Sequence, residues 1–486
     1  MNRHLIAWLI NILIGSTICT AQSLEYLQVG GTANDHGYSM ISDISGNVFI
    51  TGSTRSYGQG SEDIFLVKMN KFEELEFQKT YGSTHHDIAR SIDLAADGGY
   101  VIFGEAWDHG HGREDMYLLK VDQDGNTLWE QSFGGNHTDQ GHSVEALPDG
   151  YACLGYTASY GGSTRGNFLL TRTDLSGNIL WEKDYGTEFL DYGFSVKQIW
   201  DGGLALLGNK GGFFNLARAD FTNHDSDVLL VLTLPDGEEE KRISWGGSGH
   251  DWGKYMVLTD ESILVVGSSQ QEETQSFDIF LAEISQEGSL TRESYYGGNG
   301  FEFGEALCRS TDGMIYIAGT SSSLSSDGST DIYIAKTMLN GDLIWEQRLG
   351  GTGSDYGFDI LPMPDSGCLV LGEIEDPILH TQDLYLARLN KNGELMSLGK
   401  PKDLEPIIIK IYPNPASDYI RVKWLNQLDS SSSILQIFNL SGQIVHHEEI
   451  PGQEETFISL PDLSPQTLIY QVISKDARFT GKLVIQ

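Results

Sequence analysis

One unit of about 52 residues recurs seven times along this chain of 486 residues. Each copy begins with an acidic residue shortly after a glycine, and the intervals between these first markers are 52, 52, 52, 60, 51 and 53 residues. The first markers are Asp35, Asp87, Asp139, Asp191, Asp251, Glu302 and Asp355. A second marker that begins with Asp63 and a glycine marker that begins with Gly52 repeat with nearly the same period. A fixed period of this length indicates a repeat architecture.

The second copy shows what one unit contains. Its pattern predicts strands at 89–95, 100–104, 116–121 and 127–133, joined by hairpin turns rich in Asp, Gly and Asn. Four short antiparallel strands at this period predict one blade of a β-propeller, and seven units predict a closed ring of seven four-stranded blades. A β-solenoid usually has shorter repeats and an array of β-sandwiches has longer ones, so both alternatives fit less well.

The ends of the repeat region predict how the ring closes. Residues 24–29 have the pattern of a fourth strand but precede the first copy, whereas residues 394–398 end the seventh copy weakly. We therefore expect the N-terminal segment to complete the last blade. Trp129, Trp181 and Trp345 recur near the start of fourth strands, and we expect them to pack between adjacent blades.

The N-terminus predicts export. Residues 5–18 are predominantly apolar and are followed by a small-x-small cleavage site, so residues 1–21 are predicted to be a signal peptide that is too short for a membrane span. A lipoprotein signal at Cys19 fits less well, because Ile18 stands where a small residue is expected. No later stretch could span a bilayer, so we expect a mature chain that is not an integral membrane protein. The net charge of −37 argues against nucleic acid as a partner.

Cleavage would leave Cys153, Cys308 and Cys368, each among apolar residues of a predicted strand. We expect these to be buried thiols rather than parts of a disulfide framework. A closed ring without a dimerisation motif favours a monomer.

The repeat stops after Gly399, so residues 22–400 are predicted to form the propeller, 401–406 a linker and 407–486 a separate, small immunoglobulin-like β-sandwich. Three motifs mark this last region, namely Tyr412-Pro413-Asn414-Pro415, the segment 435–443 with Gly442, and the terminal segment 481–486 with Lys482. Their order and the terminal position of the last one resemble the type A sorting domain of the type IX secretion system of Bacteroidota. The resemblance implies export through that machinery, followed by removal of this domain and by release or attachment at the outer cell surface.

The repeats themselves resemble the β-propeller repeats of secreted bacterial proteins, and the turn at 174–181 looks like that of quinoprotein propellers. Quinoprotein dehydrogenases carry a vicinal Cys pair beside their quinone, which this chain lacks, so no quinone cofactor is expected.

Binding residues are expected on the face where loops between the second and third strands vary in length, because variable loops on a rigid scaffold usually carry recognition. The longest loop runs from 209 to 227. The candidate ligand-binding residues on this face are Phe213, Phe214, Phe221, Trp107 and Tyr160.

Histidines gather on the same face, and mixed His and carboxylate ligands suit a divalent cation such as zinc. The candidate metal ligands are His36, Asp35, His86, Asp87, His137 and Asp139. In the competing interpretation, each acidic marker accepts backbone N–H groups of its own blade. The primary functional hypothesis is a non-enzymatic secreted or cell-surface protein that binds a protein or glycan. The alternatives are a secreted hydrolase or lyase that uses His and Asp residues of blades one to three, and a structural surface component.

Overall fold

The computed structural model describes residues 17–20, 26–107, 110, 114–160, 166–211, 226–323, 329–351, 353–375, 380–398, 408–413, 415–424, 433–439, 444–450, 455–461, 464–473 and 478–485. The chain divides into two compact units, one formed by Leu24–Gly399 and one that joins Lys400–Gln486 to Met1–Ser23. The described residues form strands but no helix, so this part of the chain has no helix that is long and apolar enough to cross a membrane.

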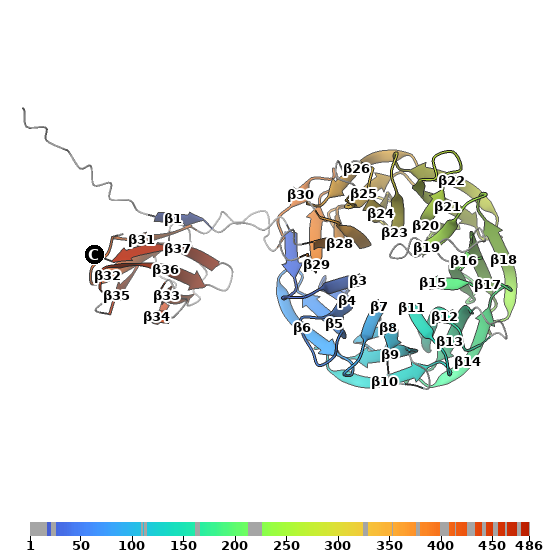
Figure 1. Cartoon of the computed structure of the whole chain (residues 1–486), viewed down its shortest axis with the longest axis horizontal. Coiled ribbons are helices and arrows are strands. Elements are labelled where there is room, and N and C mark those ends of the chain that lie inside the picture. The colour runs from blue at the N-terminus through green and yellow to red at the C-terminus, as the bar shows by residue number, and fades with distance from the viewer. Residues whose placement is uncertain are drawn as a thin grey trace, which may run out of the picture. The chain divides into compact units, whose positions relative to one another are not determined.

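The first unit is a ring of seven antiparallel sheets, as the repeat predicted (Figure 1). The innermost strands are β3 (Asp35–Ser42), β7 (Asp87–Leu94), β11 (Asp139–Leu147), β15 (Tyr192–Gln198), β19 (Asp251–Leu258), β23 (Glu302–Arg309) and β27 (Tyr356–Pro362). The second strands are β4 (Val48–Thr54), β8 (Tyr100–Ala106), β12 (Gly150–Thr157), β16 (Leu204–Lys210), β20 (Ser262–Gln270), β24 (Ile315–Ser321) and β28 (Cys368–Glu375).

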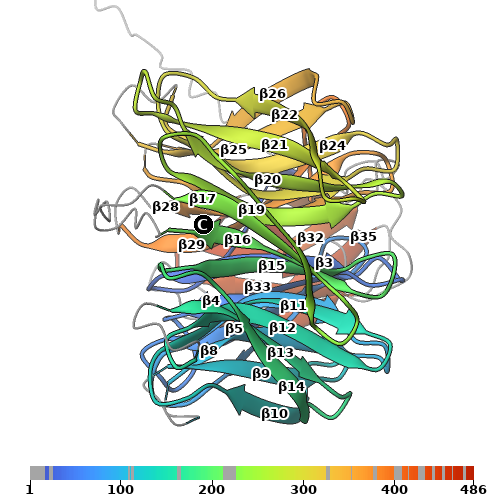
Figure 2. The ribbon, with the colours of Figure 1, turned by 90° about the vertical axis from the view of Figure 1, so that its right-hand side faces the viewer.

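The third strands are β5 (Asp63–Met69), β9 (Asp115–Val121), β13 (Asn167–Thr173), β17 (Asp227–Thr233), β21 (Phe277–Ser285), β25 (Asp331–Thr337) and β29 (Gln382–Leu389). The outer strands of the first six blades are β6 (Leu75–Tyr81), β10 (Thr127–Phe133), β14 (Ile179–Tyr185), β18 (Glu239–Trp245), β22 (Leu290–Tyr296) and β26 (Leu343–Leu349). The twist of these sheets is visible from the side in Figure 2.

Blade seven closes the ring as expected. The N-terminal strand β2 (Tyr26–Val29) pairs antiparallel with β29, with Tyr26 opposite Ala387. The two-residue strand β30 (Leu395–Met396) pairs with the other end of β29. The N-terminal segment and the last copy of the repeat are thus held in one sheet.

The core lies between neighbouring blades. Second and third strands are buried along nearly their whole length, whereas an outer strand such as β10 is mostly exposed or half-buried, which explains its mixed sequence. Trp129 of β10 packs across a blade junction as expected: its ring centroid lies 5.8 Å from that of Tyr151 in blade three. Cys153, Cys308 and Cys368 are free and buried, which confirms the expectation for the thiols.

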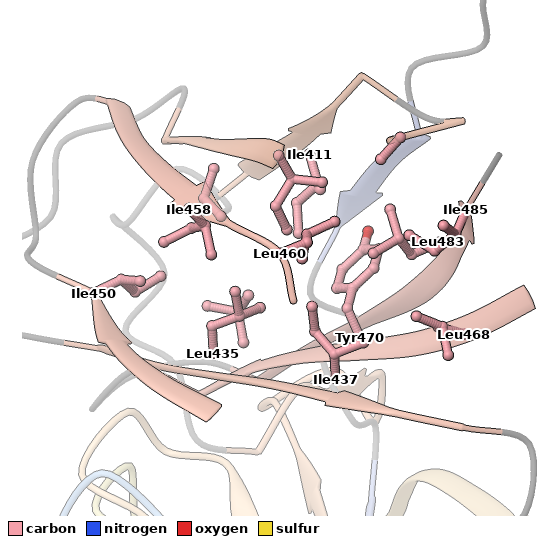
Figure 3. Packing of buried hydrophobic residues seen from close by; sticks show 14 residues of the cluster. Ile411, Leu435, Ile437, Ile450, Ile458, Leu460, Leu468, Tyr470, Leu483 and Ile485 are labelled. Carbon is pink, nitrogen blue, oxygen red and sulfur yellow. The ribbon is translucent and has the colours of Figure 1, made fainter. Parts of the chain in front are cut away.

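The C-terminal unit has two four-stranded sheets packed around one core (Figure 3). One sheet has the order β1 (Thr17–Thr20), β31 (Ile408–Tyr412), β32 (Tyr419–Trp424) and β35 (Glu455–Ser459). The other has the order β34 (Ile444–Ile450), β33 (Ser433–Phe438), β36 (Gln466–Ile473) and β37 (Arg478–Ile485). Leu435, Tyr470 and Leu483 lie at the centre of the core (Figure 3). A sandwich of two sheets was expected, and its immunoglobulin-like topology stays a prediction.

Strand β1 belongs to the segment that the sequence predicts to be a signal peptide, and it pairs with β31, Thr17 opposite Ile411. Tyr412 ends β31 and is joined to Pro413 by a cis peptide bond. Lys482 lies in β37 opposite Ile469. Asn414 and Gly442 lie outside the described residues.

Candidate binding site in the central channel

Each innermost strand has a β-bulge at the same place in its blade. In β3, Gly37 lies opposite Gly52 and Ser39 opposite Thr51, so Tyr38 is an extra residue without a partner in the ladder. The same shift in register occurs in all seven blades. A bulge re-aims the side chain of the extra residue and often does so beside a functional site.

The bulged residues share one cavity of about 550 Å³ in the middle of the ring, which we call the central pocket. They come from blades one to seven in order and are Tyr38, Arg90, His142, Phe194, Lys254, Glu305 and Phe358. A cavity of this size matches those that hold small molecules. The fold therefore gathers seven residues that lie about 52 positions apart in sequence.

Neighbouring blades pack closely beside the bulge. A Cβ atom at Gly141, just before the bulged His142, would lie 2.4 Å from the carbonyl oxygen of Gly104 in the preceding blade. Gly357 stands in the same relation to Gly319. Six of the seven bulged residues follow a glycine and Arg90 follows Ala89, so a small residue at this position leaves room for the neighbouring blade beside the bulge.

The bulged residues include aromatic rings and charged groups, and the charged groups are paired with neighbouring side chains. The Arg90 guanidinium lies 4.8 Å from the centroid of the Tyr38 ring, and the Lys254 ammonium lies 4.7 Å from that of Phe194. Arg90 donates two hydrogen bonds to Glu105, at 3.1 and 2.9 Å, and Lys254 pairs with Glu305 at 3.2 Å. The side chains are thus fixed by cation–π contacts and ion pairs before a ligand enters.

Two further groups of the wall have shifted pKa values. Burial lowers the pKa of His142 well below its usual value, and the charges of Arg90 and Lys254 lower it further, so this imidazole is neutral at neutral pH. Burial raises the pKa of Asp359 to about 6, although its bonds from the N–H groups of Met40 and Ile360 oppose this. Asp359 directly follows the bulged Phe358.

The acidic markers have a local role in the structure. All seven are buried, and each accepts a hydrogen bond from the backbone N–H four residues before it, as Asp139 does from Gly135 at 2.8 Å. The other pairs are Gly31 with Asp35, Ser83 with Asp87, Thr187 with Asp191, Gly247 with Asp251, Gly298 with Glu302 and Gly351 with Asp355. This geometry matches the interpretation of the markers as a repeated turn motif.

The structure does not bring the candidate metal ligands together as one cluster. His36 contacts Glu373 at 2.6 Å, His86 contacts Glu62 at 3.4 Å, and the backbone N–H of His137 donates to Ser159. Glu373 raises the pKa of His36 against the opposing effect of burial. Within the described ranges, no group of three or more His, Cys, Asp or Glu side chains could hold a metal. The metal site stays a prediction.

The candidate ligand-binding residues are only partly described. Phe213, Phe214 and Phe221 lie outside the described residues. The Trp107 ring lies 5.2 Å from that of His86, and the Tyr160 hydroxyl donates to the carbonyl of Gly134. Neither residue lines the central pocket.

Sequence reasoning concentrated on loops and missed the pocket. The signal was the position three residues after each first marker, which carries Tyr, Arg, His, Phe, Lys, Glu and Phe in turn. The neighbouring positions carry similar residues in each copy, whereas the side chain at this position differs in chemistry from copy to copy.

Comparisons with known families agree with both units. Residues 410–486 match the family described as a secretion system C-terminal sorting domain, and residues 311–343 match a β-propeller domain of unknown function (DUF5122). The chain is thus a β-propeller protein with a type IX secretion tail. No curated protein matches the sequence.

Several solved structures are similar at low identity. The β-propeller domain of the trilobed protease from Pyrococcus furiosus is 12% identical with a TM-score of 0.41, and the match covers 76% of this chain and 98% of that one. The Neurospora crassa Pan2 WD40 domain is 10% identical with a TM-score of 0.42, covering 77% and 98%. An acylaminoacyl peptidase from Pyrococcus horikoshii is 11% identical with a TM-score of 0.40, covering 80% of this chain and 58% of that one.

Proposed function

We propose that this chain is a secreted or cell-surface binding protein whose central pocket binds a small, ring-shaped polar ligand, such as one sugar unit of a glycan. The observation that carries the proposal is the convergence of the bulged residues of all seven blades on one cavity. Aromatic faces such as those of Tyr38, Phe194 and Phe358 suit a flat ring, and the polar groups between them suit its hydroxyls.

Delivery follows from the two ends of the chain. The sorting domain at residues 410–486 supports export by the type IX machinery, which is the expected partner, and the apolar residues 5–18 support a signal peptide. The mature protein would then meet its ligand outside the cell, in a bacterium of the Bacteroidota.

The enzymatic alternative has less support. It depends on His and Asp residues of blades one to three, but Asp35, Asp87 and Asp139 are buried and hydrogen-bonded to their own loops. A binding site needs no such residue to act as a base.

A glycan array probed with the chain without its predicted signal peptide, residues 22–486, tests the proposal. Phe358→Ala removes one aromatic face of the pocket and should abolish the signal, whereas Ile44→Ala, at a fully exposed position, should not. Trp107→Ala probes the loop face. If Trp107→Ala abolishes binding and Phe358→Ala does not, the site lies among the loops and the pocket is not the binding site.

A further inference from the structure

Basic and acidic side chains line different parts of the central pocket. Arg90, His142 and Lys254 line it from blades two, three and five, whereas the acidic residues Glu305 and Asp359 line it from blades six and seven. One arc of the wall therefore holds two positive groups and a neutral imidazole, and the other holds carboxyl acceptors.

Arg90 keeps donors for a ligand although it is paired. A guanidinium has five N–H groups, and Glu105 accepts two of them on a single oxygen. Glu105 is buried, and its carboxylate fixes the position of the Arg90 guanidinium. The Tyr38 ring supports the flat face of the same guanidinium.

Lys254 is held in the same way. Glu305 takes one contact from its ammonium at 3.2 Å, which leaves further N–H groups of the three that an ammonium carries. The ammonium lies over the Phe194 ring, so its direction is fixed.

His142 lies between these cations in blade order, and its Nε2 atom is buried without a hydrogen-bond partner in the described part of the chain. Its ring packs against Phe194 at 5.2 Å. The positive charges of Arg90 and Lys254 both lower the pKa of His142, so their electrostatic potential at the imidazole is positive although each is paired with a carboxylate. An anionic oxygen at this position would be stabilised by both charges and would accept a hydrogen bond from Nε2 in the neutral tautomer that carries its proton there.

The opposite arc needs donors from a ligand. Asp359 already accepts two backbone N–H groups, and Glu305 pairs with Lys254. An ionised carboxylate has no hydrogen to donate, so a ligand must supply the donors, such as hydroxyl groups. Between the arcs, Phe358 lies edge-on to Tyr38 at 5.4 Å and offers an apolar wall to a ring.

We propose that the ligand of the central pocket is a sugar acid, a ring with hydroxyl groups and one carboxylate, and that its carboxylate lies at His142 between Arg90 and Lys254. This inference rests on the proposed function and specifies its ligand class. His142 is then a specificity-determining residue, because it contacts the group that distinguishes a sugar acid from a neutral sugar.

Isothermal titration of the mature chain tests the inference with D-glucuronate, D-galacturonate and N-acetylneuraminate against D-glucose and D-galactose. At least one acid should bind about tenfold or more tightly than the neutral sugars, and the preference should shrink as salt is added. His142→Phe keeps the packing against Phe194 but removes the nitrogen, so it should lower affinity for the acid. Ile44→Ala should leave it unchanged.

The outcomes separate the two proposals. Equal affinity for acids and neutral sugars overturns the carboxylate assignment while the proposed function stands. An acid that binds equally well to the parent chain and to His142→Phe also overturns it, and Lys254→Gln gives a second test if His142→Phe does not fold. If no sugar of either class binds and the glycan array is blank, both proposals fail.

Discussion

The carboxylate of Asp359 in blade seven accepts the backbone N–H of Met40 in blade one at 2.7 Å, across the junction where the ring closes. Burial raises its pKa to about 6. An Asp in an unfolded chain titrates near about 3.9, so the folded protein binds more protons between these values. The free energy of unfolding should therefore fall by about 3 kcal/mol as the pH rises from about 4 through about 6. Above about pH 6, Asp359 should cause no further change.

Denaturant unfolding of the parent chain and of Asp359→Asn measures this effect. Other titrating groups cancel in the difference between the two free energies of unfolding, which should change with pH only through residue 359. A difference that is constant from about pH 4 to about pH 7 would contradict the assigned pKa shift.

Gly177→Ala should destabilise the propeller more than Gly313→Ala. Both glycines have positive φ, +79° and +82°, so both substitutions carry the cost of a left-handed alanine, about 1 kcal/mol. At Gly177 the new Cβ would also lie 2.7 Å from the Trp129 ring, whereas nothing lies within 4 Å at Gly313. The extra cost should be about 1 to 3 kcal/mol.

Chemical denaturation of the two variants provides the comparison. Equal losses would show that Trp129 moves aside freely and does not pack firmly between blades two and three.

Val29→Ala should weaken ring closure. Val29 of β2 is buried in the cluster that includes Leu384 and Leu386 of β29. Removing two methyl groups there should lower the free energy of unfolding by about 2 kcal/mol. Leu75→Ala, on an exposed outer strand of blade one, is the control, and a loss no larger than the control's would mean that β2 contributes little.

The three buried thiols should resist a thiol reagent in the native protein. Burial raises the pKa of Cys153, Cys308 and Cys368, so little reactive thiolate forms, and the reagent cannot reach it. Native mature protein should release almost no chromophore with a disulfide reagent, and protein in guanidinium chloride should release three equivalents. Rapid reaction of one native thiol would show that its blade opens locally.

Much of the fold could be predicted because its signals are local and repeated. The spacing from Asp35 to Asp87 gives the length of one blade, and the turns around Gly98 and Gly125 give its hairpins. The closing role of β2 followed from one surplus outer strand. Nothing local encodes the order of strands in the C-terminal sheets, where β33 pairs with β36.

The pocket was harder to predict because it depends on a shift of one residue. Periodicity places Tyr38 on one side of a regular strand, and only the bulge after Gly37 sends it into the channel. The partners of Tyr38 are also distant in sequence, since Arg90 and Phe358 come from other blades.

The pairing of β2 with β29 also sets the order in which the propeller can form. Gln28 of β2 donates a hydrogen bond to Asp383 of β29 although the two lie 355 residues apart. A nascent chain makes β2 early and its partner late, so the ring stays open until blade seven has been synthesised. Contacts of such high sequence separation form slowly, because the entropy of closing the loop must be overcome first. Ring closure is therefore a step that can follow only after all seven blades have been synthesised.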